Sequence, residues 1–249
     1  MKNYICFNKT NIRELGPSIQ NVKETIFEED LSIVVDDLIN HIFKEVNEGR
    51  EAMRKKQFFD YINNHKISSR EIYIWLLNNQ TNSNSIYLLG YFNYRGIEIN
   101  VNKQKGIELY QKAAVELENS VAQFDLSYIC IRGKDVEKNY NLAFELANKL
   151  TEKEYLSGIN MLGYCYDCGI GTDVNEEKAF GLYQKSADLG NSQGTNNLGC
   201  CYENGAGVEV DKQKAFELYK KMANLGSNSA QYNLASMYEY GNAVEENID

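Results

Sequence analysis

Apolar side chains recur every three or four positions across residues 31–46, and polar side chains fill most of the positions between them. This spacing places the apolar residues on one face of an α-helix, and the acidic residues at 28–30 favour a helix N-terminus. The stripe consists of Leu31, Val34, Val35, Leu38, Ile39, Ile42, Phe43 and Val46. We expect an amphipathic helix that either packs on the first repeat as an N-terminal cap or serves as a docking or dimerising helix.

Two shorter helices follow in the pattern, one over about residues 50–63 and one over 69–79. The second begins after Ser68 and has Glu71 three residues later, which is the arrangement of a capping box. Trp75 is expected to anchor this part of the chain. Together these helices would form a cap or linker in front of the remaining sequence.

The remaining sequence is built from an internal repeat of 36 or 37 residues. Glycines recur at Gly96, Gly133, Gly169, Gly205 and Gly241. Small residues recur with the same steps at Gly90, Ser127, Gly163, Gly199 and Ala235. Self-similarity at such a period is the signature of a repeat architecture, in which neighbouring units bury each other's apolar faces.

Each unit contains two helical patterns, and so predicts a helix hairpin. Helix A, such as residues 192–203, ends at a glycine that suits a left-handed C-cap. Helix B, such as residues 211–225, begins at a capping side chain such as Asp211 or Asn175. Further small residues inside helix A should mark close helix contacts where bulk is costly: Ser85, Ala122, Gly158, Gly194 and Ala230.

These patterns divide the chain into a tail, a cap and a repeat array. The expected boundaries are 1–24 for a poorly ordered tail, 25–82 for the helical cap or linker, and 83–249 for the repeats, with units at 83–119, 120–156, 157–191 and 192–226 and a partial unit at 227–249. The last unit lacks its helix B, so we expect residues 230–249 to fray, either because the product is truncated or because another molecule completes the site.

The run NLGCCYENGAGV at residues 197–208, followed by Asp211 and KAFELY at 214–219, resembles a Sel1-like repeat. The resemblance covers roughly residues 83–249. It implies an all-α fold, a right-handed superhelical solenoid of helix hairpins related to tetratricopeptide arrays, which typically acts as an adaptor and brings no catalytic residues. The unit at 122–154 departs from the pattern because it lacks the second turn glycine, and an irregular turn is expected there.

Sel1-like repeats also occur downstream of protein kinase domains, joined by a helical linker that resembles residues 31–80. The chain shows no glycine-rich phosphate loop, no His-Arg-Asp catalytic loop and no Asp-Phe-Gly motif. The alternative hypothesis is therefore a regulatory or substrate-docking repeat region of a kinase-type signalling protein, with a kinase-pathway component as its partner.

Composition narrows the class of partner. A formal net charge of -9 and the lack of a basic stripe argue against nucleic acid. No run approaches the roughly 18 apolar residues of a membrane helix, and no secretion signal is evident. We therefore expect a protein or peptide partner, a location in the cytoplasm or nucleus, and reduced cysteines. Oligomeric state stays open.

Four cysteines suggest a metal or thiol site, because thiolates two residues apart are common zinc ligands. They are Cys165, Cys168, Cys200 and Cys201. The repeat frame instead places Cys165 and Cys201 at a core position that holds other apolar residues elsewhere, where cysteine behaves as a small hydrophobe. His41 and His65 have no identifiable nucleophile partner. A thiol- or metal-dependent enzyme is a weak alternative, and we expect no catalytic residue, metal or cofactor.

A row of aromatic residues is the candidate binding site. In hairpin solenoids helix A usually lines the concave surface, and its positions opposite the core leucine hold Tyr87, Tyr91, Phe124, Tyr128, Tyr164 and Tyr232. Clustered aromatic side chains suit the binding of a peptide or a helix. The alternative is that these rings only wedge between neighbouring A helices.

Overall fold

The computed structural model describes residues 28–50 and 54–239, and the regular structure within these ranges is helical. The all-α fold class predicted from the sequence is confirmed. The tail predicted for residues 1–24, the glycine Gly241 and the last ten residues of the segment expected to fray lie outside the described residues.

Within the described residues, three helices precede the repeats: α1 (Glu28–Asn47), α2 (Arg54–Asn64) and α3 (Ser69–Asn78). The predicted stripe of α1 is buried, except that Phe43 is half-buried. The capping box at the start of α3 is confirmed, since the Ser68 side chain accepts from the Glu71 backbone N–H and the Ser68 N–H donates to the Glu71 carboxylate at 2.9 Å. Trp75 is buried, as expected of an anchor.

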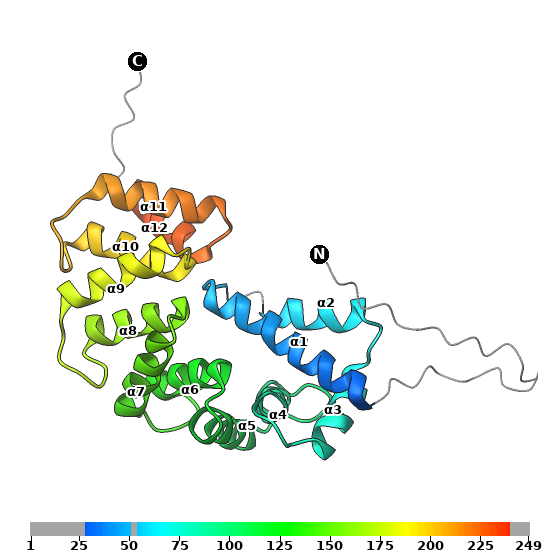
Figure 1. Cartoon of the computed structure of the whole chain (residues 1–249). Coiled ribbons are helices and arrows are strands. Elements are labelled where there is room, and N and C mark those ends of the chain that lie inside the picture. The colour runs from blue at the N-terminus through cyan, green and yellow to red at the C-terminus, as the bar shows by residue number, and fades with distance from the viewer. Residues whose placement is uncertain (1–27, 51–53, 240–249) are drawn as a thin grey trace, which may run out of the picture.

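Four helix hairpins and one further helix A follow in the part of the chain that the structure describes. The hairpins are α4 (Ser83–Arg95) with α5 (Lys103–Gln111), α6 (Ser120–Arg132) with α7 (Tyr140–Glu152), α8 (Leu156–Cys168) with α9 (Glu176–Asp188), and α10 (Ser192–Asn204) with α11 (Lys212–Asn224); α12 (Asn228–Glu239) comes last. Each helix packs on its neighbours in sequence, and the hairpins stack into a curved solenoid (Figure 1). The right-handed α–α superhelix implied by the resemblance is the fold of this chain.

Local chemistry sets the helix ends as the sequence predicted. Four recurring glycines adopt the left-handed conformation at the C-cap of helix A: Gly96, Gly133, Gly169 and Gly205. Asn175 and Asp211 cap α9 and α11 by accepting a backbone N–H three residues on, at 2.8 and 3.0 Å. Glycine adopts the left-handed backbone conformation without the steric cost that a Cβ imposes. This explains why glycine recurs at this position in each repeat.

A short π-helix accounts for the one step of 37 residues. It spans Lys112–Glu116 (η2) and directly continues α5. Such a π-helical turn takes up one extra residue without ending the helix. The extra residue falls between Gly106 and Ala122, since the equivalent segments of the later repeats are one residue shorter.

Small residues in helix A mark close contacts with helix B of the preceding repeat, as predicted. A Cβ on Gly158 would overlap Leu150 of α7, and a Cβ on Gly194 would lie 2.7 Å from the Ser186 hydroxyl of α9.

The other recurring series contacts helix B of its own repeat. A Cβ on Gly163 or Gly199 would lie 2.9 or 2.7 Å from the ring of Tyr183 or Tyr219. In the second repeat the tyrosine position holds Ala147, and the glycine position can therefore hold Ser127.

The concave side of the first three repeats is covered by the chain's own N-terminal helix (Figure 1). α1 packs on α4, α6 and α8, which are helices A of these repeats. At its end, the Asn191 amide donates to the Asn47 carbonyl at 2.8 Å and the Ser192 N–H donates to the Glu48 carbonyl at 3.0 Å. The predicted packing of this helix on the first repeat is confirmed, and its contacts extend further: α1 also packs on the second and third repeats, and its end is hydrogen-bonded to Asn191 and Ser192 at the start of the fourth.

Candidate binding groove

The aromatic row expected on an open concave face is open only in part. Tyr87, Tyr91 and Phe124 are 0%, 1% and 4% exposed, because α1 and α2 lie over this end of the concave side. Phe58 of α2 packs on Tyr91 with ring centroids 5.9 Å apart. The exposed residues of the row are Tyr128, Tyr164 and Tyr232.

An ion pair holds α2 over these buried rings. The Arg54 guanidinium donates to both carboxylate oxygens of Asp125 in α6, each at 2.7 Å. The Tyr87 hydroxyl donates to the same carboxylate at 3.0 Å. Both charged side chains are largely buried, with exposures of 6% and 13%. A buried pair of this geometry fixes orientation, because neither charge tolerates loss of the other.

A groove with a volume of about 920 Å³ begins where α1 ends. One wall comes from the end of α1 and the start of α2, with Glu45, Arg50 and Gln57. The floor comes from helices A of three successive repeats, α6, α8 and α10, and the far end from the turn between α11 and α12. Tyr128 and Tyr164 line this groove, whereas Tyr232 is not among its lining residues.

Amide side chains continue the row where the aromatic residues stop. Asn160 and Asn196 line the groove at the repeat positions that Phe124 and Tyr232 occupy in their own repeats. The Asn197 amide donates to Asn160 at 3.0 Å, which joins α10 to α8. Amide groups offer both donors and acceptors, and so suit a polypeptide backbone. The sequence-based prediction missed these two asparagines because it selected only aromatic residues. The repeat period of 36 residues, counted from Phe124, leads to both positions.

The charges at the groove differ in how they are satisfied. Arg50 forms ion pairs with Glu45, at 2.8 Å, and with Glu48. The hydrogen bond from Arg50 lowers the pKa of the Glu45 carboxyl below its usual value. Arg132 instead lies over the ring of Tyr128, 4.6 Å from its centroid, and makes no ion pair within the described ranges.

The cysteines lie where the repeat frame places them. Cys165 and Cys201 are buried at 0% and 3% exposure, and burial raises the pKa of each thiol to about 12. Cys168 is exposed, and the histidines His41 and His65 are exposed as well. Among the side chains of residues 31–50 and 54–239, no three from His, Cys, Asp or Glu are grouped so as to hold a metal ion.

A membrane span requires a helix that is both long and apolar. Within the described part of the chain, no helix meets both conditions.

Comparison with known proteins identifies the repeats. The Sel1 repeat model matches residues 83–114, 120–155, 156–191, 192–227 and 228–249. A solved Sel1 repeat protein from Oxalobacter formigenes superimposes with a TM-score of 0.64 at 20% identity, over 85% of this chain and 92% of that chain. A protective antigen of uropathogenic Escherichia coli strains with an SLR fold gives 0.59 at 21% identity, over 89% of this chain and 54% of that chain. The family model matches most of the sequence, and this chain therefore belongs to the Sel1 repeat family.

Proposed function

We propose that the chain is a non-catalytic scaffold that binds a segment of another protein in the groove between α1 and the helices A of the second to fourth repeats. The Sel1 repeat fold is generally a non-catalytic protein-interaction fold, and this solenoid is consistent with such a scaffold. The observation that carries the proposal is the groove itself: a volume of about 920 Å³ on the concave side, left uncovered by α1.

The chain itself provides an example of what this concave side accommodates. α1 lies on helices A of the first three repeats through an apolar stripe, and its end is held by hydrogen bonds to Asn191 and Ser192. The groove continues the concave surface beyond the end of α1. There Tyr128 and Tyr164 are exposed, and the amides of Asn160 and Asn196 line the groove with them. Aromatic rings supply contact area and amides supply hydrogen bonds, which is the combination that peptide-binding surfaces use.

Photo-crosslinking tests the proposal with a matched control. A photoreactive phenylalanine replaces Tyr164 in the groove or Tyr140 at the start of α7, whose exposures are 39% and 38%. We expect a defined partner segment to crosslink from position 164 and not from 140. We also expect Tyr164→Ala with Asn196→Ala to abolish capture of that partner, while Tyr140→Ala retains it. Equal crosslinking from both positions, or none from 164, would contradict the proposal.

A further inference from the structure

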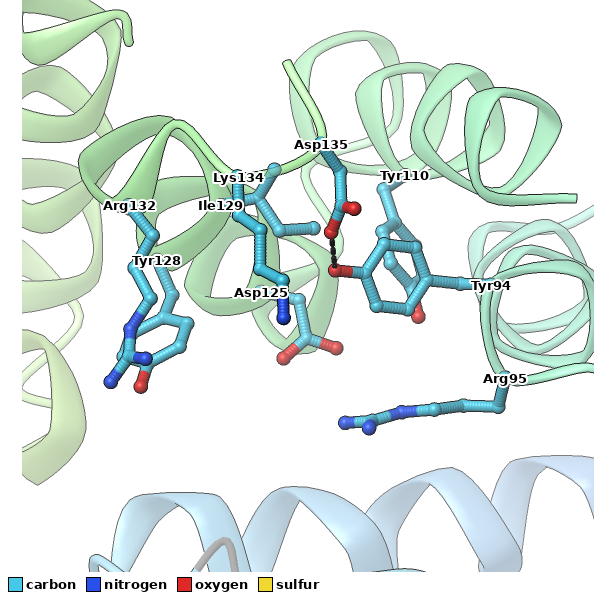
Figure 2. A pocket seen from close by; sticks show the side chains of 9 residues that line it. All are labelled: Tyr94, Arg95, Tyr110, Asp125, Tyr128, Ile129, Arg132, Lys134 and Asp135. Atoms are coloured by element: carbon cyan, nitrogen blue, oxygen red, sulfur yellow. Dashed lines mark hydrogen bonds between the residues drawn. The ribbon is translucent and has the colours of Figure 1, made fainter. Parts of the chain in front are cut away.

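A second, smaller cavity opens beside the groove, between the first and second repeats (Figure 2). Its volume is about 210 Å³, and its walls come from α4, α5, α6 and the turn after α6. Tyr128 and Arg132 line both this cavity and the groove, so one bound segment can reach into both. We refer to it as the basic pocket, because of the charges described next.

The two acidic residues of the basic pocket are already neutralised. Asp125 is held by both bonds from Arg54. Asp135 accepts from the Lys103 ammonium and from the Tyr94 hydroxyl, each at 2.6 Å. The hydrogen bonds from Lys103 and Tyr94 keep the pKa of the Asp135 carboxyl below its usual value, so this group stays ionised and paired.

The three cations of the basic pocket have no such partner. Arg95, Arg132 and Lys134 line it, and none of them forms an ion pair with the side chains of residues 31–50 and 54–239. Because Arg54 and Lys103 offset Asp125 and Asp135, these three leave a local excess of three positive charges. The whole chain carries a formal charge of -9, so this is a local concentration and not a general property of the surface.

Aromatic rings hold the two guanidinium groups in place. Arg132 lies 4.6 Å from the Tyr128 centroid, and Arg95 lies 5.7 Å from that of Tyr91 and 5.8 Å from that of Tyr94. The two side chains approach from opposite sides of the pocket (Figure 2). A guanidinium that rests on a ring keeps its N–H groups free, and these form paired hydrogen bonds with a carboxylate or a phosphoryl group.

The irregular turn of the second repeat helps to build this pocket. Asp135 occupies the position of Gly171 and Gly207 in the next repeats, and its carboxylate reaches back to α4 and α5. Ile170 and Ala206 donate a second capping bond to the end of helix A, from N–H to the carbonyls of Cys165 and Cys201. Among the described residues, no equivalent bond from Lys134 is seen.

We propose that the basic pocket binds one anionic group, a carboxylate or a phosphoryl, carried by the protein segment that lies in the groove. This inference rests on the proposed function and adds the chemistry of the partner. A cluster of three cations in a small cavity matches a single anionic group. A polyanion such as a nucleic acid would need a longer basic surface, and the chain has no such stripe.

A random-peptide display library, panned on the full chain, tests the inference. We expect the wild-type chain to enrich peptides with an acidic residue at one fixed position. We expect Arg95→Gln with Arg132→Gln to enrich peptides without that preference, while Arg70→Gln, at an exposed position of α3, leaves it unchanged. Arg132→Glu should invert the preference toward a basic residue. Circular dichroism establishes that each variant remains helical.

The failures of the two proposals are distinguishable in this experiment. If the wild-type chain enriches no peptide, both the groove proposal and the present inference fail. If it enriches peptides that need Tyr164 but show no fixed acidic position, the groove stands and the basic pocket proposal is overturned. An acidic preference that survives in Arg95→Gln with Arg132→Gln overturns the basic pocket proposal as well.

Resynthesised peptides identify the anionic group. An enriched peptide is prepared with glutamate, phosphoserine or glutamine at the fixed position, and its affinity is measured by fluorescence polarisation. Replacement of glutamate by glutamine should weaken binding to the wild-type chain on the order of tenfold, the loss of a charge-assisted hydrogen bond, and should have no effect on Arg95→Gln with Arg132→Gln. Tighter binding of phosphoserine than of glutamate assigns a phosphoryl ligand, and the reverse order assigns a carboxylate; equal binding of all three overturns the inference.

Discussion

Removal of the Asp125 charge should release α2 from the concave side. Asp125→Asn leaves the Arg54 guanidinium, only 6% exposed, without its counter-charge. Breaking a buried pair from one side costs about 3–5 kcal/mol, because a buried charge is left uncompensated. Arg54→Met should cost less, about 1–3 kcal/mol, because Asp125 keeps the bond from the Tyr87 hydroxyl at 3.0 Å and borders a cavity that water can enter.

Hydrogen exchange measures this effect where it is expected. The two variants should accelerate exchange of α2 amides more than exchange of α9 amides, since α9 does not contact the pair. A change of 3–5 kcal/mol in the free energy of local opening corresponds to roughly 10²- to 10⁴-fold faster exchange of the α2 amides. Glu145→Gln, which breaks an exposed ion pair with Lys149 on α7, is the matched control and should leave α2 unaffected.

The double variant decides whether the two side chains act as a pair. Arg54→Met with Asp125→Asn leaves no buried charge, so it should exchange more slowly in α2 than Asp125→Asn alone. If the two single effects simply add, within about 0.5 kcal/mol, the residues are not coupled and the reasoning fails. Equal acceleration in α2 and α9 would refute it as well, because the pair would then stabilise the whole fold and not the position of α2.

Three further predictions concern glycines, thiols and pH. Gly158→Ala should lower the free energy of unfolding by about 1–3 kcal/mol, since the added Cβ would overlap Leu150. Gly181→Ala, with open space around the added Cβ, should raise the free energy of unfolding by about 0.5–1 kcal/mol. Urea unfolding compares the two variants, and equal effects would contradict the contact with Leu150. Mass spectrometry after brief iodoacetamide treatment should find Cys168 alkylated and Cys165 protected until the chain unfolds, and early labelling of Cys165 would contradict its burial. Burial raises the pKa of Cys165 from 9.0 to about 12, so as pH rises its thiolate forms first in the unfolded chain. The stability that this thiol contributes below pH 9 should therefore be lost between pH 9 and pH 12. Thermal unfolding across this range should show a smaller loss for Cys165→Ala than for the wild-type chain, and an equal loss would exclude this thiol as a cause.

The features that sequence predicted correctly depend on short-range chemistry. The helix hairpins, the left-handed glycines and the Ser68 capping box each follow from residues fewer than forty positions apart, and the repeat presents the same evidence several times. The burial of Cys165 and Cys201 was predictable for the same reason, because equivalent positions in other repeats hold apolar residues.

The path of α1 could not be predicted, because an amphipathic pattern shows that a helix has one apolar face and not which surface receives it. The contact between Asn47 and Asn191 joins residues 144 positions apart, beyond any local pattern. The burial of Tyr87 and Tyr91 depends on that path, so it could not be predicted from the sequence either. The basic pocket was missed for a related reason: Arg95 and Arg132 belong to different repeats and become neighbours only when the repeats stack.

The attachment of α1 at both ends of its path has a mechanical consequence. A solenoid whose units touch only their neighbours bends like a spring, with its compliance spread along its length. Here α1 lies across the concave side and contacts the solenoid from α4 to the start of α10. We expect these contacts to restrict bending between the first three repeats. We therefore expect bending to concentrate beyond the start of α10, in the hairpin of α10 with α11 and in α12. The groove lies between the end of α1 and this part of the solenoid, so we expect its width to change with such bending.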